Sequence, residues 1–160
     1  MIVDFSELPS TSKVWIFQSN RSLNDEELES IQHKLADFLS QWTAHGADLK
    51  AGFEFRYKRF IIVALDQHQN KATGCSIDAL IHFVQALETT LSIDLLDKMN
   101  VSYKQGEFIA YKNLVDFKTM AKKRSVSPKT IVFNNLVDDK AEYLENWEIP
   151  ASESWHARFF

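Results

Sequence analysis

The first half of the chain alternates short apolar runs with two longer amphipathic stretches. Residues 14–17 are β-branched or aromatic, which predicts a buried strand. From Leu28 to Trp42 apolar residues recur every three or four positions, so we expect a helix that starts after Ser22 or Asn24 and ends at Gly46. The same spacing between residues 77 and 91 predicts a second helix, with its first turn near residues 74–76.

Two strands are predicted between these helices. Apolar and charged residues alternate over 53–58, as in a half-buried strand, whereas residues 60–65 are apolar on both faces, as in a central strand. A hairpin turn near residues 58–59 would join them.

The second half of the chain predicts smaller elements. Residues 101–104 and 107–111 indicate two strands, and Asn113 can cap a helix that ends in a cationic cluster at 122–124. A strand at 130–133 and a short helix at 139–146 follow. The aromatic residues of the last fourteen positions predict a C-terminal tail that docks on the rest of the protein.

This order of elements predicts an α+β fold. Strand, helix, strand, strand, helix and strand over residues 14–104 match the split βαβ pattern of a ferredoxin-like sandwich, with a mainly antiparallel sheet and helices on one face. We expect residues 1–160 to form a single domain. Within it, residues 1–98 would form the ferredoxin-like core and residues 99–160 a small β-β-α-β extension with the docked tail.

Charge and cysteine content narrow the class of partner and the compartment. The formal net charge is −4, which argues against a dedicated nucleic-acid or anionic-membrane binder. The single cysteine cannot form an intramolecular disulfide, and the longest apolar run is far too short to span a membrane. We therefore expect a cytoplasmic protein, and a homo-oligomer stays open.

Cys75 is the one candidate nucleophile, because the exposed N–H groups at a helix start favour a thiolate. Asp78 and His82 share its helical stripe, opposite the apolar one. Seven helical residues span roughly 10 Å, so His82 lies too far along the helix to be the base for Cys75. A second base would have to come from a loop such as residues 18–21, and the alternative is a solvated helix face.

Other polar residues stand at the ends of predicted elements and could face a ligand. Together with the Cys75 stripe they form a set of candidate binding residues: Gln18, Asn20, Arg21, Cys75, Asp78, His82, Asn134, Asn135 and Arg158. For the two asparagines after the last strand, the alternative is an ordinary turn.

Motifs for nucleotide, hydrolase or metal chemistry are missing from the sequence. It contains no GxxxxGK[ST] loop, no GxGxxG and no GxSxG, and its five histidines show no metal-ligand spacing. We therefore expect no metal and no cofactor. The leading hypothesis is a non-enzymatic binding or interaction protein for a protein partner or small ligand, and the alternative is an enzyme of unrecognised class that uses Cys75.

Five segments carry a resemblance to a known family: VWIFQSNR at 14–21, QWTAHG at 41–46, GCSID at 74–78, VFNNLV at 132–137 and SWHARFF at 154–160. Together they resemble an uncharacterised Bacteroidetes family of proteins of about this length. Some members of that family carry the label ABC transporter ATPase. The present sequence lacks the phosphate loop and the LSGGQ-type signature that such an ATPase needs.

Overall fold

The computed structural model describes residues 1–160 and shows two compact units. The first comprises residues 1–96 and 138–141, and the second comprises residues 97–137 and 142–160. Both units combine helices with antiparallel sheet, so the predicted α+β class is confirmed. The predicted division after residue 98 lies close to the first boundary, but the sequence did not indicate that residues 138–141 return to the first unit.

The first unit is built on a three-stranded antiparallel sheet in the order β1-β5-β4. Its strands are β1 (Lys13–Gln18), β4 (Lys50–Arg56) and β5 (Phe60–Asp66). Residues 60–65 of β5 are fully buried, which confirms the central strand predicted from their two apolar faces. A 3₁₀ turn, η1 (Phe5–Glu7), and a small hairpin of β2 (Thr43–Ala44) and β3 (Ala47–Asp48) complete this part.

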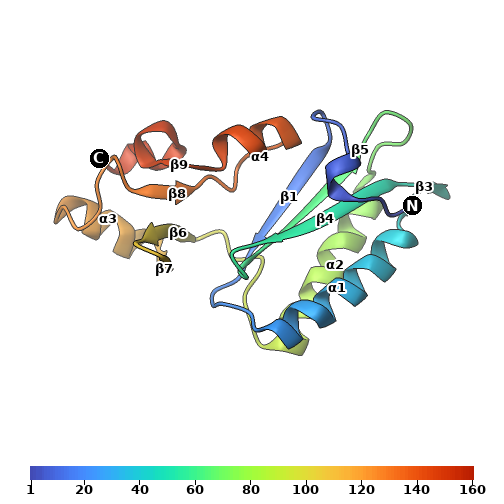
Figure 1. The fold of residues 1–160 in the computed structure, drawn as a ribbon, viewed down its shortest axis with the longest axis horizontal. Helices are drawn as coiled ribbons and strands as arrows, with labels where there is room; N and C mark the ends of the chain where they lie inside the picture. The colour runs from blue at the N-terminus through green and yellow to red at the C-terminus, as the bar shows by residue number, and fades with distance from the viewer. The chain divides into compact units, whose positions relative to one another are not determined.

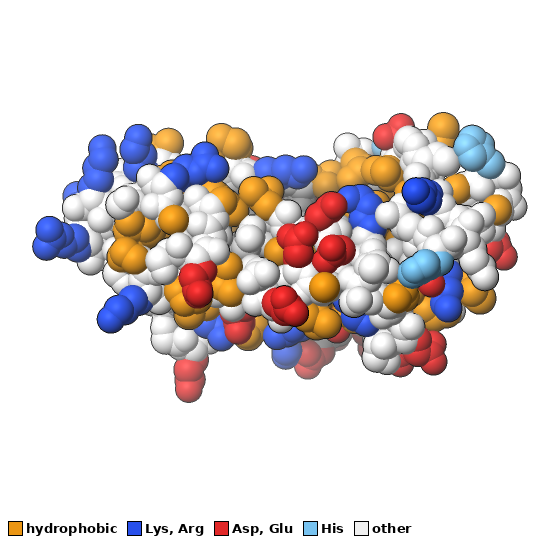
Figure 2. Space-filling view, turned by 90° about the horizontal axis from the view of Figure 1, so that it is seen from above, with side chains coloured by type: hydrophobic (Ala, Val, Ile, Leu, Met, Phe, Trp, Pro, Cys, Tyr) orange, Lys and Arg blue, Asp and Glu red, His pale blue; other side chains and the backbone are white.

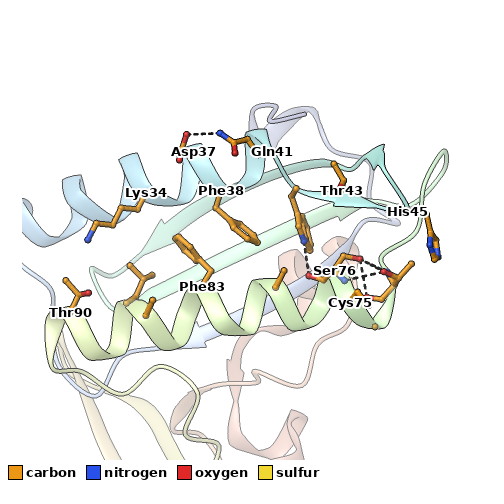
Figure 3. A pocket seen from close by; sticks show the side chains of 16 residues that line it. Lys34, Asp37, Phe38, Gln41, Thr43, His45, Cys75, Ser76, Phe83 and Thr90 are labelled. Atoms are coloured by element: carbon orange, nitrogen blue, oxygen red, sulfur yellow. Dashed lines mark hydrogen bonds between the residues drawn. The ribbon is translucent and has the colours of Figure 1, made fainter.

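Two helices, α1 (Asp25–Ser40) and α2 (Gly74–Leu91), cover one face of this sheet (Figures 1 and 3). Of the two caps that the sequence left open, Ser22 and Asn24, it is Asn24 that caps α1, and its side chain and that of Glu27 form a reciprocal capping box. Thr73 and Ser76 form the equivalent box at the start of α2. The apolar stripes of both helices join the strand residues in one core.

The predicted end of the first helix is wrong. Helix α1 stops at Ser40, and Gly46 (φ +79°) lies in the turn of the β2–β3 hairpin instead of capping the helix. Trp42 is nevertheless buried in the core, and its indole N–H is satisfied because it donates to the carbonyl of Ser76 at 2.8 Å. Trp42 continues the apolar spacing of α1 and contacts the core, although the helix has already ended at Ser40.

The second unit contains a four-stranded antiparallel sheet in the order β7-β6-β8-β9. The strands are β6 (Asn100–Gln105), β7 (Phe108–Asn113), β8 (Ile131–Phe133) and β9 (Glu148–Pro150). Helix α3 (Leu114–Lys122) begins at the predicted cap Asn113. Within this unit, Lys and Arg side chains project on the side that carries α3 (Figure 2). The remaining elements are α4 (Lys140–Asn146), which spans a unit boundary, η2 (Ala151–Glu153) and η3 (Trp155–Phe159).

The aromatic tail packs inside this second unit. Phe117 of α3 has no exposed surface, and the rings of His156, Phe159 and Phe160 lie edge-on to it at centroid distances of 5.9, 5.7 and 6.3 Å. Aromatic rings packed edge to face stabilise each other beyond the area they bury.

The complete ferredoxin-like sandwich is not confirmed. The strand that would finish that pattern, at residues 101–104, pairs with β7 and β8 in the other sheet. The outer edge of β1 instead holds a strap formed by residues 138–141. Here the N–H of Val14 donates to the carbonyl of Asp138 at 3.0 Å, and the N–H of Lys140 donates to the carbonyl of Ser12 at 2.8 Å.

Candidate functional site: a groove between α1 and α2

A groove of about 940 Å³ runs along the first unit between its two helices (Figure 3). Both helices and the segment after α1 contribute to its walls, and α1 and α2 run in opposite directions along it. The lining residues are Lys34, Asp37, Phe38, Gln41, Trp42, Thr43, His45, Thr73, Gly74, Cys75, Ser76, Ala79, Phe83, Ala86, Leu87 and Thr90.

Aromatic side chains form the apolar part of this groove. Phe38 of α1 and Phe83 of α2 are stacked, with ring centroids 4.8 Å apart and planes 24° from parallel. Trp42 lies 5.8 Å from Phe38, and Trp15 lies edge-on to Trp42 at the same distance. Both phenylalanines are only partly buried, so they leave apolar surface facing the groove.

Where the groove passes the start of α2, the polar groups of Thr73 and Ser76 are already hydrogen-bonded within the protein. Ser76 Oγ accepts from the N–H of Thr73 at 2.7 Å and lies 2.8 Å from the Thr73 hydroxyl. The carbonyl of Ser76 accepts from Trp42. This network fixes the start of α2 against the end of α1 and gives the groove a rigid wall.

Charged residues are few along the rims. Lys34 and Asp37 lie on α1, have opposite signs and are exposed. The α2 rim carries small or uncharged residues such as Ala79, Ala86 and Thr90. The groove therefore offers apolar surface with little net charge.

The structure brings Cys75 into the groove but leaves its predicted companions outside. Cys75 is exposed and lines the groove, whereas Asp78 and His82 are exposed and do not belong to its lining. The groove face of α2 consists of the stripe that runs from Cys75 through Ala79, Phe83, Ala86 and Thr90.

His45 is the histidine that shares the groove with Cys75, and both lie at the same end of it (Figure 3). Sequence reasoning missed it because His45 was assigned to the end of the first helix, far along the chain from Cys75. The available signal was the Gly46 that follows it, which favours a turn.

The candidates after β1 hold the first unit together. Arg21 pairs with both oxygens of Glu27 at 2.9 and 2.7 Å and donates to the carbonyl of Leu91 at 3.0 Å, so it ties the start of α1 to the end of α2. The hydrogen bonds from Arg21 and from the Asn24 backbone lower the pKa of Glu27 to about 2. Asn20 accepts from the N–H of Asp94 at 3.0 Å, and Gln18 is buried.

The remaining candidates belong to the second unit. Asn134 Oδ1 accepts from the N–H of Leu136 at 3.2 Å, and Asn135 Oδ1 accepts from the indole N–H of Trp147 at 2.9 Å. Arg158 is exposed, with its guanidinium 5.3 Å from the centre of the Trp155 ring. These contacts are those of turn and tail residues, and none of the three lines the groove.

A smaller polar pocket of about 210 Å³ lies beside β3 and the end of β5, lined by Met1, Asp48, Lys50, Asp66, Gln69 and Asn70. The backbone N–H and the ring of His68 bind Asp66 and lower its pKa. The structure brings together no group of three or more His, Cys, Asp or Glu side chains that could hold a metal ion.

Comparisons with known proteins found no matching family model, no similar curated protein and no similar solved structure. Among the helices, none is both long enough and apolar enough to cross a membrane.

Proposed function

We propose that this protein is a cytoplasmic, non-enzymatic binding protein whose groove between α1 and α2 holds a small, largely apolar and uncharged molecule. The observation that carries the proposal is the groove itself, about 940 Å³ in volume and lined by the stacked pair Phe38 and Phe83. Small-molecule sites in proteins have volumes of roughly 300–1,000 Å³ and mostly apolar walls with a few polar groups.

The distribution of charge supports an uncharged ligand. Placing a charge against apolar walls is unfavourable unless an opposite charge or several hydrogen bonds compensate for it. The charged lining residues Lys34 and Asp37 oppose each other in sign on the exposed α1 rim. The hydroxyl of Thr90 and the amide of Gln41 lie far apart along the groove (Figure 3), so each would orient a different polar group of the ligand.

The fold around the groove also fits the first five of the six elements of a ferredoxin-like sandwich. We interpret the order β1-β5-β4, with α1 and α2 on one face, as one split βαβ unit followed by its second helix. In this interpretation the strap of residues 138–141 lies beside β1, where such a sandwich has its last strand.

A titration with Nile red, an uncharged apolar dye, tests the proposed function. Ala86 lines the groove and is exposed, so Ala86→Trp would fill the groove without disturbing the core. Gln85→Trp is the matched control, because Gln85 is the adjacent exposed residue and lies outside the lining. We expect Ala86→Trp to weaken dye binding by about tenfold or more, which equals about 1.4 kcal/mol, and Gln85→Trp to leave it unchanged. Equal binding by both variants would rule out the groove.

The second candidate function is an enzyme that uses Cys75 on a molecule bound in the groove. It is favoured by one observation, the exposed Cys75 at the groove end that also carries His45. The rate of reaction of Cys75 with iodoacetamide separates the two candidates. A rate that is already maximal near about pH 6 would support an activated thiolate, and a rate that still rises above neutral pH would support the binding protein.

A further inference from the structure

Strand β7 is an edge strand of the second unit. Its single strand neighbour is β6, and the order β7-β6-β8-β9 leaves its other edge without a partner strand. The six residues of β7 pair with β6 in one continuous register, and the strand contains no proline. Lys112 is its only charged residue. An edge with so little protection is a template for pairing with another strand.

Exposed apolar side chains stand at both ends of this edge. Phe108, at the start of β7, is 78% exposed. At the other end lies Val115, which is 74% exposed. Single exposed apolar residues are common, but two of them at the ends of one free strand edge indicate a contact surface.

We propose that β7 pairs in antiparallel fashion with β7 of a second copy of this chain, so that two four-stranded sheets join into one. A two-fold axis perpendicular to the sheet relates two such strands and keeps each side chain on its own face. Residues of the same parity then face each other. When Ala110 lies opposite its own equivalent, Phe108 lies opposite Lys112 of the second copy.

The side chains of β7 complement each other in this register. The Lys112 ammonium of one copy meets the exposed Phe108 ring of the other, a cation–π contact that symmetry makes twice. On the opposite face Ile109 meets Tyr111, a cross-strand pair of β-branched and aromatic residues. Because one strand carries both members of each pair, a second copy fits this edge better than an unrelated strand.

Sedimentation velocity of the full chain over a range of concentrations tests the proposal. We expect the wild type to form dimers as concentration rises. Phe108→Lys places two ammonium groups opposite each other and should raise the dimer dissociation constant by about tenfold or more. Phe108→Glu also removes the ring but pairs with Lys112, so dimerisation should persist. Phe108→Lys combined with Lys112→Glu should restore it.

Leu144→Lys is the control, since Leu144 is also exposed, lies in the same unit and is remote from β7 in sequence. It should leave the association unchanged, and circular dichroism should show that all variants fold, because the substituted side chains are exposed. A wild type that stays monomeric at every concentration would overturn the proposal. Equal weakening by Phe108→Lys and Phe108→Glu, or no recovery in the double variant, would overturn it as well.

Discussion

The two units cover their sheets in different ways. In the first unit, two helices meet through the stacked rings of Phe38 and Phe83, and a groove remains between them. In the second unit, one helix and the aromatic tail enclose Phe117, which keeps no exposed surface. Aromatic residues therefore do two different things in this protein. They leave accessible apolar surface where two helices touch at a few points, and they fill the space where a tail folds over a single helix.

The largest expected change is in the free energy of unfolding, when one of these aromatic rings is removed. Phe117→Ala removes a fully buried ring and should reduce the free energy of unfolding by about 3–5 kcal/mol in a urea titration. Phe83→Ala removes a ring that is only partly buried, so we expect a loss of about 2 kcal/mol or less. Similar losses in the two variants would contradict the difference between the two units.

Acid should destabilise the second unit before the first. Burial and the charge of Arg158 lower the pKa of His156 to about 4, whereas its ordinary value is 6.5. Between these values the unfolded chain binds the proton more strongly, so the stability that is present above pH 6.5 is lost as pH falls toward 4, by roughly 3 kcal/mol in all. Glu27, in the first unit, has its pKa lowered from 4.5 to about 2, so its contribution is lost only at lower pH.

His156→Gln, which cannot titrate, should remove the dependence of stability on pH between 6.5 and 4. The exposed His82 provides the control variant His82→Gln. Unfolding by urea at several pH values measures both. If the free energy of unfolding of His156→Gln still falls between pH 6.5 and pH 4, another group causes the pH dependence.

The strap beside β1 depends on a buried lysine. The ammonium of Lys140 donates to the carbonyls of Phe5 and Leu8 at 2.9 and 2.7 Å, and it lies 5.0 Å from the centre of the Phe5 ring. Lys140→Met keeps the aliphatic length but leaves both carbonyls without this donor, so stability should fall by about 2 kcal/mol. The exposed Lys129, changed to Met, should have no measurable effect. Equal results for the two variants would remove the role assigned to Lys140.

The smallest expected change in stability comes from the indole N–H groups of two tryptophans, one in each unit. Trp42→Phe loses the hydrogen bond to the Ser76 carbonyl in the first unit and should reduce stability by about 1 kcal/mol beyond the loss of ring area. Trp155 Nε1, in the second unit, is buried without a hydrogen-bond partner. Trp155→Phe therefore removes an unsatisfied donor and should destabilise less than Trp42→Phe in thermal unfolding. The reverse order would contradict the proposed rigid wall of the groove.

Local patterns in the sequence predicted the elements but not their partners. The two apolar faces of β5 and the cap at Asn113 depend on neighbouring residues, and both predictions are confirmed. The strand at 101–104 was predicted as a strand but assigned to the wrong sheet, because strand pairing depends on long-range contacts that periodicity does not encode.

The candidate site was only partly predictable for the same reason. Exposure of Cys75 at the start of α2 follows from helix periodicity, and the structure shows it. Which stripe of α2 lines the groove depends on where α1 lies, so Asp78 and His82 were chosen and the Ala79 and Phe83 stripe was not. His45 lines the groove because it lies in the β2–β3 hairpin, which the sequence analysis predicted as the end of the first helix.

The most direct test of the proposed binding function is a two-dimensional ¹H–¹⁵N NMR titration of the full chain with 2-naphthol, a small uncharged aromatic probe. The account predicts saturable shift changes at amides of the groove residues, centred on Phe38, Ala79 and Phe83, with little change at His82 and Gln85 beyond that of their immediate neighbours. Changes concentrated outside residues 34–45 and 73–90, or no saturable change at all, would contradict it.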